Sequence, residues 1–237
     1  MPGRGKRKPP PDADRRRLAD VGRWDHGVME SSEVVQLVRP RAGHFDLGTG
    51  YHGDLWLDLD ALFLRPARLR PYVDWLAERL RGHGVDAVCG PLEGGAFLAY
   101  AVADRLGVAF LAGYRAPGVA SYRLPAVYGG IGGWRVGVVD DAVNASTAIA
   151  ACLEELRSQR AVPVAAAAVI ALGEASTMVP ARLGVPFYAA GTMPSRAWPA
   201  PECPLCADGV PVTPGAPITP GAPITPGDGR SAPPAGR

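Results

Sequence analysis

The sequence predicts a single α/β domain built around a doubly wound parallel sheet. Short apolar runs alternate with stretches of helical period, as a parallel sheet requires, because each of its strands must be joined to the next by a crossover. Five runs are predicted to be strands: 85–89, 108–112, 136–139, 164–172 and 185–189. Sheets of this kind bind ligands at the carboxyl ends of their strands, so the candidate site is expected there.

Helices are predicted between most of these strands and before the first. Apolar residues recur at helical spacing in one stretch, at Leu69, Val73, Leu76 and Leu80. Pro66 stands at its start and Gly82 just past its end, which predicts a surface helix over 66–81. Two further helices are predicted over 96–106, which Gly107 closes, and over 145–158. Residues 113–133 are predicted to be a long, Gly-rich loop.

Composition divides the chain into a body and two tails. Residues 211–237 repeat Pro, Gly, Ala and Thr and contain too few large side chains to offset their ordering entropy, which predicts a disordered tail. Residues 1–17 hold seven basic groups against two acidic ones and are predicted to be a disordered basic arm. The body is therefore assigned to residues 18–210.

Charge and cysteine content exclude several classes of protein. A formal net charge of +2 over 237 residues excludes a strongly basic nucleic-acid binder. Four cysteines are too few for a disulfide scaffold and fit a reducing cytoplasm. The chain has no apolar run of the roughly 20 residues that span a bilayer, and its start has no apolar signal core. Neither a membrane nor a specific nucleic acid is expected as a partner.

The most informative segment is the predicted strand 136–139 with the residues that follow it. The strand ends in two adjacent acids, Asp140 and Asp141, and small or polar residues then open a helix. The free N–H groups of a helix start can hold a phosphate, and the acids can accept hydrogen bonds from sugar hydroxyls or contact hydrated Mg²⁺. A simple helix cap at Asn144 explains the same residues equally well, so both interpretations stay open at this point.

This segment resembles a known signature. Val-Val-Asp-Asp-Ala-Val-Asn-Ala-Ser-Thr-Ala-Ile, residues 138–149, is similar to the phosphoribosyl-pyrophosphate (PRPP) motif of the type I phosphoribosyltransferases. The resemblance implies a parallel sheet flanked by helices with a small N-terminal hood. It also implies that the two acids hold the ribose hydroxyls and that the next loop holds the 5-phosphate, through Asn144, Ala145, Ser146, Thr147 and Ala148. Asn144 and Ser146 stand where the family usually has Thr and Gly.

Two further segments resemble the same family. Cys89-Gly90-Pro91-Leu92-Glu93-Gly94-Gly95-Ala96 is similar to its pyrophosphate loop, which implies PRPP contacts from Pro91, Leu92, Glu93 and Gly94. Residues 45–58 are similar to the N-terminal segment of the orotate phosphoribosyltransferases, which implies a base pocket at Thr49 and His52. Taken alone, the first segment is a tight strand-to-helix turn and the second a hairpin.

The cations expected near the diphosphate are arginines. The only lysines of the chain are Lys6 and Lys8, whereas the orotate enzymes carry a lysine on a mobile loop. Arg115 and Arg123 lie in the corresponding segment, and a guanidinium can clamp a phosphate through two parallel hydrogen bonds. With Asp140 and Asp141 they form the predicted catalytic set.

One cysteine pair is left over by this interpretation. Cys203-Pro204-Leu205-Cys206 could give two ligands of a zinc site, but a structural zinc needs four, and no other Cys or His has matching spacing. A zinc site completed by another subunit and a simple reduced turn both stay open. A redox pair is disfavoured, since the strand-to-helix setting is absent.

The sequence thus predicts an orotate-like phosphoribosyltransferase that uses PRPP and Mg²⁺ and acts as a homodimer on small molecules. A non-catalytic PRPP or nucleotide sensor on the same fold is the alternative, because the loop lysine is missing. A dinucleotide-binding enzyme is disfavoured, since no Gly-x-Gly-x-x-Gly turn follows the first strand.

Overall fold

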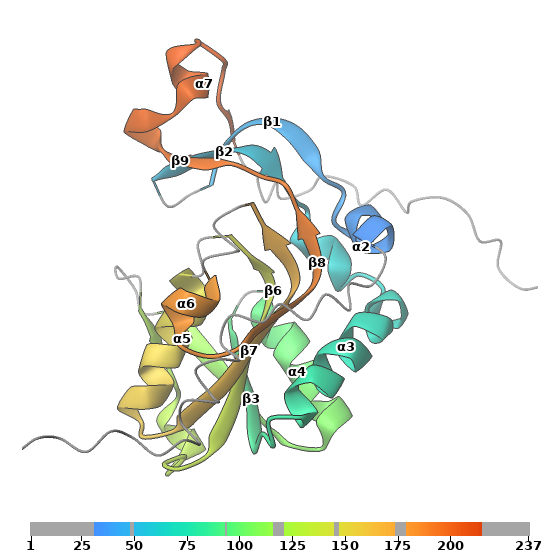
Figure 1. The fold of residues 1–237 in the computed structure, drawn as a ribbon, viewed down its shortest axis with the longest axis vertical. Coiled ribbons are helices and arrows are strands. Elements are labelled where there is room, and N and C mark those ends of the chain that lie inside the picture. The colour runs from blue at the N-terminus through green and yellow to red at the C-terminus, as the bar shows by residue number, and fades with distance from the viewer. Residues whose placement is uncertain are drawn as a thin grey trace, which may run out of the picture.

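The structure, a computed structural model, describes residues 31–47, 50–92, 94–115, 121–144, 147–173 and 179–214. Its centre is a six-stranded sheet in the order β5-β4-β3-β6-β7-β8 (Figure 1). The strands are β3 (Ala87–Pro91), β4 (Ala109–Arg115), β5 (Tyr122–Arg123), β6 (Arg135–Val143), β7 (Val162–Leu172) and β8 (Phe187–Met193). Neighbours pair in parallel except for the edge strand β5, which is antiparallel to β4. The five predicted strands are all present.

Helices cover both faces of this sheet, as Figure 1 shows. One face carries α3 (Pro66–Arg81) and α4 (Gly95–Leu106), and the other carries α5 (Thr147–Ser158) and α6 (Val179–Leu183). Alternate strand residues point to opposite faces and so belong to different cores. Val88 and Val139 pack with α3 and α4, whereas Cys89 and Val138 pack with α5. A doubly wound α/β fold is therefore confirmed.

Local sequence signals explain where the helices begin and end. The bounds of α3 match the prediction, with Pro66 at its first position and Gly82 after its last residue. Its apolar stripe, which includes Leu76 and Leu80, is fully buried. α4 ends at Gly107, which adopts the left-handed conformation (φ +70°) that favours glycine, and the Gly107 N–H caps the carbonyls of the last turn.

A second, smaller sheet lies beyond the carboxyl ends of the central strands (Figure 1). Its order is β10-β1-β2-β9. The members are β1 (Arg41–Asp46), β2 (Tyr51–Trp56), β9 (Ala197–Pro199) and β10 (Thr213–Pro214), and the short helix α7 (Pro204–Ala207) follows β9. We call these four strands and α7 the hood. The predicted N-terminal hood is therefore completed by segments from the C-terminal part of the chain.

Four further short elements connect these layers. They are α2 (Ser31–Val38) and the 3-10 helices η2 (Leu59–Leu62), η3 (Ala126–Tyr128) and η5 (Ala200–Glu202). Val34 and Val38 of α2 are buried in the core on the α3 side. None of the helices in the described part of the chain is long and apolar enough to cross a membrane.

Most element boundaries shift by a few residues from the prediction, and three of the differences change the layout of the chain. β6 continues past 139 to Val143, because it keeps its pairing with β7 through Asp140, Ala142 and Val143. β4 extends to Arg115, so the predicted loop 113–133 begins as strand and contains β5. Thr213–Pro214 pairs with β1, so the ordered body reaches beyond residue 210. Residues 1–17 and 215–237 lie outside the described residues, and their assignment as tails stays a prediction.

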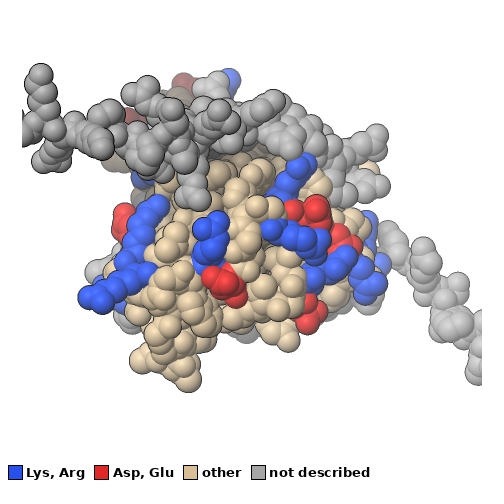
Figure 2. Space-filling model, turned by 60° about the horizontal axis from the view of Figure 1, so that its bottom comes forward, with Lys and Arg blue, Asp and Glu red and all other residues tan. Residues whose placement is uncertain are grey.

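The face of the molecule that lies opposite the hood has no single-sign charged area. Figure 2 shows arginine side chains there beside acidic and uncharged ones. This mixture agrees with the small net charge of the whole chain and offers no continuous basic surface to a nucleic acid on that face.

Candidate active site

The candidate site lies at the point where the strand order of the central sheet reverses. The chain goes from β3 outward to β4 and then returns to form β6 on the other side of β3. Pro91 is paired with Gly113, and Cys89 is paired with Val138, so Pro91, Gly113 and Asp140 lie at one level. A crevice forms at such a reversal because the connections leave to opposite faces of the sheet.

The two acids lie buried in β6 at this level. Asp140 and Asp141 are each only 8% exposed. The carboxylate of Asp140 accepts a hydrogen bond from the N–H of Asp141 at 3.0 Å, and that of Asp141 accepts one from the N–H of Ala142 at 2.7 Å. Within the described residues no Arg or His forms an ion pair with either acid. Among the residues that the structure describes, the pair thus concentrates negative charge with no cation paired to it.

Burial raises the affinity of both acids for protons. Burial raises the pKa of Asp140 well above its usual range, and the neighbouring charge of Asp141 raises it further. Burial also raises the pKa of Asp141, against hydrogen bonds that lower it. A bound cation or a set of hydroxyl donors would relieve this strain, because either stabilises the charged form. Perturbed acids in a crevice are typical of functional sites.

The turn between β3 and α4 faces these carboxylates directly. A Cβ built on Gly94 would overlap the carboxylate of Asp141, and one built on Gly95 would come within 2.6 Å of Asp140 Oδ1. Gly94 has an ordinary helical backbone (φ −85°), so the need for glycine there is steric. The structure therefore brings together two segments that were predicted separately, the acid pair and the Gly-Pro loop.

Other predicted residues surround this contact to different degrees. Leu92 donates its N–H to the carbonyl of Gly113 at 2.7 Å, which fixes the loop to β4. Asn144 is half-buried just after β6, and Thr147 and Ala148 form the first turn of α5. Thr49, Glu93, Ala145 and Ser146 lie outside the described residues, so their predicted roles stay predictions.

The two candidate arginines differ in their surroundings. Arg115 is exposed at the end of β4, two residues past the level of the acids. Arg123 donates to the carboxylate of Glu155 at 3.0 Å, which makes it less available to a phosphate than Arg115. The roles of both arginines at the diphosphate stay predictions.

Glu155 is a residue that sequence reasoning missed. It is 6% exposed and also accepts from the Leu124 N–H at 3.2 Å and from Gln159 at 3.1 Å. Burial alone would raise the pKa of Glu155, but these hydrogen bonds and Arg123 outweigh it and lower the pKa. Its signal was a carboxylate on the buried face of α5, three residues after Cys152. Glu155 anchors the segment after β5 to the helix that begins at the predicted phosphate loop.

His52 lies away from the acids, in the hood. The ligand atoms of His44, His52, Cys203 and Cys206 all lie within 4.8 Å of one another. Sequence spacing did not match any histidine to the cysteine pair, and the fold supplies two. The neighbours of His52 in the structure are thus metal-binding side chains, while its predicted role in a base pocket is untested.

Comparison with known proteins agrees with this geometry. No protein-family model matches the chain. The orotate phosphoribosyltransferase of Caldanaerobacter subterraneus subsp. tengcongensis is 30% identical over 185 residues, which cover 78% of this chain and 93% of that protein. The protein of the same name from Heliobacterium modesticaldum is 30% identical over 193 residues, covering 77% and 96%. The chain belongs to the orotate phosphoribosyltransferase family.

Solved structures show the fold of this family. The orotate phosphoribosyltransferase of Aeropyrum pernix superposes with a TM-score of 0.55 at 26% identity, over 69% of this chain and 94% of that one. The adenine phosphoribosyltransferase of Thermoanaerobacter pseudethanolicus gives a TM-score of 0.56 at 18% identity, over 68% and 99%. The second likeness concerns the fold alone. The predicted type I phosphoribosyltransferase fold is thereby confirmed.

Proposed function

We propose that this protein is a pentosyltransferase that moves ribose-5-phosphate from PRPP to a nucleobase, with an orotate-like base as acceptor. The observation that carries the proposal is the buried pair Asp140–Asp141 packed against the Gly94–Gly95 turn at the switch point of the sheet. Membership of the orotate phosphoribosyltransferase family agrees with it.

The reaction exchanges one bond at C1 of the ribose for another. A ring nitrogen of the base forms a bond to C1 while the bond from C1 to the diphosphate oxygen breaks, and the electron pair of that bond leaves with the diphosphate. The ribosyl centre becomes cationic on the way. Asp140 and Asp141 accept hydrogen bonds from the ribose hydroxyls, and their negative charge favours the cationic centre. An orotate-like base reacts as an anion, so the protein needs no general base.

The remaining predicted residues position the two phosphate ends of PRPP. Asn144 and the first turn of α5, with Ala145, Ser146, Thr147 and Ala148, hold the 5-phosphate, since a helix start offers free N–H groups and a favourable dipole. The loop from Pro91 to Gly94 holds the diphosphate through its backbone. Arg115 is the better placed of the two arginines to neutralise the leaving group, because Arg123 is paired with Glu155.

The acid pair also fits Mg²⁺. Carboxylate oxygens are the ligands this ion prefers, and Asp140 and Asp141 form no ion pair within the described residues. Mg²⁺ bound with PRPP would supply charge neutralisation at the diphosphate. The two carboxylates would hold the ion or its water shell, and that contact would lower their raised pKa values.

Two finer expectations accompany this function. We place the enzyme in the cytoplasm, and its four cysteines, all free in the structure, support a reducing compartment. We also expect a homodimer, as the family resemblance implies. Light scattering on the purified protein would give a mass of about twice 24.8 kDa if this is right.

The test is an assay for diphosphate release. Protein, PRPP and Mg²⁺ are mixed with orotate, uracil, adenine or no base, and released diphosphate and consumed base are measured. Release that depends on orotate supports the proposal. The alternative, a PRPP sensor, is suggested by the absence of lysine after Lys8. Thermal stabilisation by PRPP with no release for any base would favour the sensor and contradict the enzyme.

A further inference from the structure

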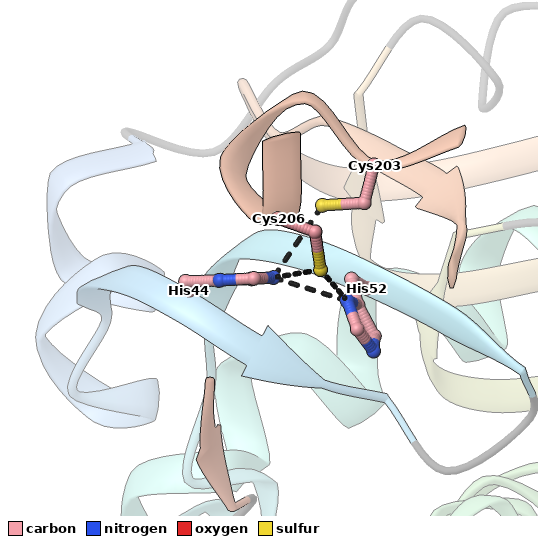
Figure 3. A group of neighbouring side chains, drawn as sticks. All are labelled: His44, His52, Cys203 and Cys206. Atoms are coloured by element: carbon pink, nitrogen blue, oxygen red, sulfur yellow. Dashed lines mark hydrogen bonds between the residues drawn. The ribbon is translucent and has the colours of Figure 1, made fainter. Parts of the chain in front are cut away.

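The hood contains a second group of chemically active side chains, far from the acids in the sequence. His44 comes from β1 and His52 from the neighbouring β2. Cys203 immediately precedes α7, and Cys206 lies within it. Figure 3 shows that the two imidazole rings and the two thiols point toward one another. None of these four residues belongs to the PRPP motif or to the pyrophosphate loop, and only His52 has a role implied by the family resemblance.

Four distances between the ligand atoms are close to those in the shell of a single tetrahedral ion, and all four atoms lie within 4.8 Å of one another. His44 Nε2 lies 3.0 Å from His52 Nδ1, 3.4 Å from Cys203 Sγ and 3.7 Å from Cys206 Sγ. His52 Nδ1 lies 3.2 Å from Cys206 Sγ. Zinc bonds of about 2.0 Å to nitrogen and about 2.3 Å to sulfur would hold the ligand atoms about 3.3 to 3.8 Å apart in a tetrahedron.

The hydrogen bond of His44 to the backbone favours metal binding. Its Nδ1 donates to the carbonyl of Val210 at 2.8 Å, because a carbonyl can only accept. With Nδ1 engaged in this way, Nε2 is the ring nitrogen that faces the other three groups. A hydrogen bond from the second ring nitrogen to a backbone carbonyl is how proteins usually orient a metal-binding histidine. His44 is 2% exposed, so its Nε2 has no access to bulk water.

The local backbone explains how each ligand reaches the centre. The pairing of β1 with β2 is irregular between Ala42 and Phe45, and a bulge of this kind re-aims the side chain within it, here that of His44. On the other side, Pro204 starts the turn after Cys203, and Gly209, with φ +70°, reverses the chain after Cys206. The Val210 N–H bonds to the Leu205 carbonyl, which closes the turn and brings the Val210 carbonyl to His44.

We propose that His44, His52, Cys203 and Cys206 form a closed, four-coordinate zinc site that fastens the two halves of the hood together. Two sulfur and two nitrogen ligands gathered within 4.8 Å of one another favour zinc. A two-iron cluster does not fit, since it would separate the imidazoles from the thiols by more than the 4.8 Å that encloses all four atoms. With four protein ligands the ion has no open position, so its role is structural. The site also takes His52 out of the base pocket.

The ion would join parts of the chain that are remote in sequence. His44 and Cys206 are 162 residues apart, so one site closes a loop that contains the entire central sheet. Closing a long loop restricts the unfolded chain strongly, and a structural zinc adds its binding free energy to folding. Loss of the ion is therefore expected to loosen the hood first.

The experiment measures metal content and stability, and it does not depend on transferase activity. The full chain, produced without a metal-affinity tag, is analysed for zinc by mass spectrometry, and we expect one zinc per chain. The protein is then unfolded and refolded in three parallel samples, with Zn²⁺, with Co²⁺ or without metal. Co²⁺ is expected to give the absorption bands of a tetrahedral thiolate complex, and zinc removal is expected to lower Tm by about 5 °C or more.

Variants with matched controls locate the site. Cys206→Ser and His52→Asn are expected to lose zinc and the cobalt bands. Asp208→Asn, an exposed neighbour in the same turn, and His83→Asn, outside the cluster, should keep both. Four results would each overturn the proposal. They are less than one tenth of a zinc per chain after refolding with Zn²⁺, iron or copper bound in its place, a metal-free Cys203–Cys206 disulfide under reducing conditions, and full zinc retention in Cys206→Ser. Circular dichroism of every variant identifies any that fails to fold.

Discussion

The acid pair on β6 and the Cys/His cluster in the hood both collect metal-binding groups, but they are built in opposite ways. Asp140 and Asp141 are neighbours in the chain, and no cation within the described residues balances their charge. The cluster draws its four candidate ligands from segments up to 162 residues apart and already brings all four within 4.8 Å of one another. An incomplete, strained site is poised for a ligand that comes and goes, whereas a complete one suits an ion that stays.

The difference also concerns stability. Charges that are buried together cost folding free energy until a ligand arrives, and such strain is common at sites that bind and release substrates. A closed zinc site, by contrast, stabilises the fold at all times. The protein would thus bind and release its substrates at the acid pair, next to a hood that the proposed metal stabilises.

The largest effect is expected from neutralising either acid. Asp140→Asn and Asp141→Asn should lower kcat/KM for PRPP by about 10²- to 10³-fold, the range seen when one preorganised electrostatic contact is removed. Steady-state kinetics with PRPP and orotate measures the loss. Asp104→Asn, an exposed acid on α4, is the control and should leave the rate unchanged. Full activity in both acid variants would show that the pair is structural and would remove the contrast with the hood.

The same variants should gain stability without ligand. The folded pKa of Asp140 is raised, so the cost of its charge is absent at low pH and appears as pH rises through that pKa. Asn carries no charge. We therefore expect Asp140→Asn to unfold at a higher Tm than the unaltered protein at neutral and alkaline pH, with the difference shrinking toward acid pH. A Tm below that of the unaltered protein at pH 8 would contradict the strain assigned to this site.

A smaller change at the turn should disturb the same carboxylate. Gly94→Ala places a methyl group where the Asp141 carboxylate lies, and such overpacking typically costs about 1–3 kcal/mol. We expect a lower Tm and roughly tenfold weaker PRPP binding by calorimetry, equivalent to about 1.4 kcal/mol. Gly130→Ala is the matched control, since a Cβ there meets no atom within 4 Å. Equal affinities in the two variants would mean that the turn and the acids act independently.

The smallest effect is expected at Glu155. Its carboxylate is buried like those of the acid pair, but it is paired with Arg123. Glu155→Gln should destabilise the fold by about 1 kcal/mol, a modest figure since Arg123 is exposed to solvent screening. The pKa of Glu155 is lowered, so its stabilisation is present above its ordinary value of 4.5 and disappears as pH falls through the folded pKa. Urea unfolding at pH 7 and pH 3 measures this, with the exposed neighbour Glu154→Gln as control. A stability difference that persists unchanged at pH 3 would argue against the ion pair.

Features encoded by neighbouring residues could be predicted from the sequence. The bounds of α3 follow from Pro66, Gly82 and an apolar stripe, all local signals. The extension of β6 through the acids could not be read locally, because it depends on pairing with β7, as between Asp140 and Ala168. Strand length is set by the partner strand as much as by the strand itself.

The two sites illustrate the same limit. The acid pair and its Gly-Pro loop were recognisable because each is a short contiguous motif. The contact between Gly94 and Asp141 needed the fold. For the cluster, only the pair Cys203 and Cys206 was visible. His44 was invisible to spacing arguments because a bulge in β1 and the return of the chain after β9 decide where its ring points.

The strand order of the hood also affects the sequence of folding during synthesis. Its outer strands β9 and β10 leave the ribosome after every strand of the central sheet, so the sheet can pack on its helices while β1 and β2 still wait for their partners. Nascent chains fold from the N-terminal side in units. Here the hairpin of β1 and β2, which is made before the central sheet, is among the last parts to be enclosed, and truncation at the C-terminal end would uncover it.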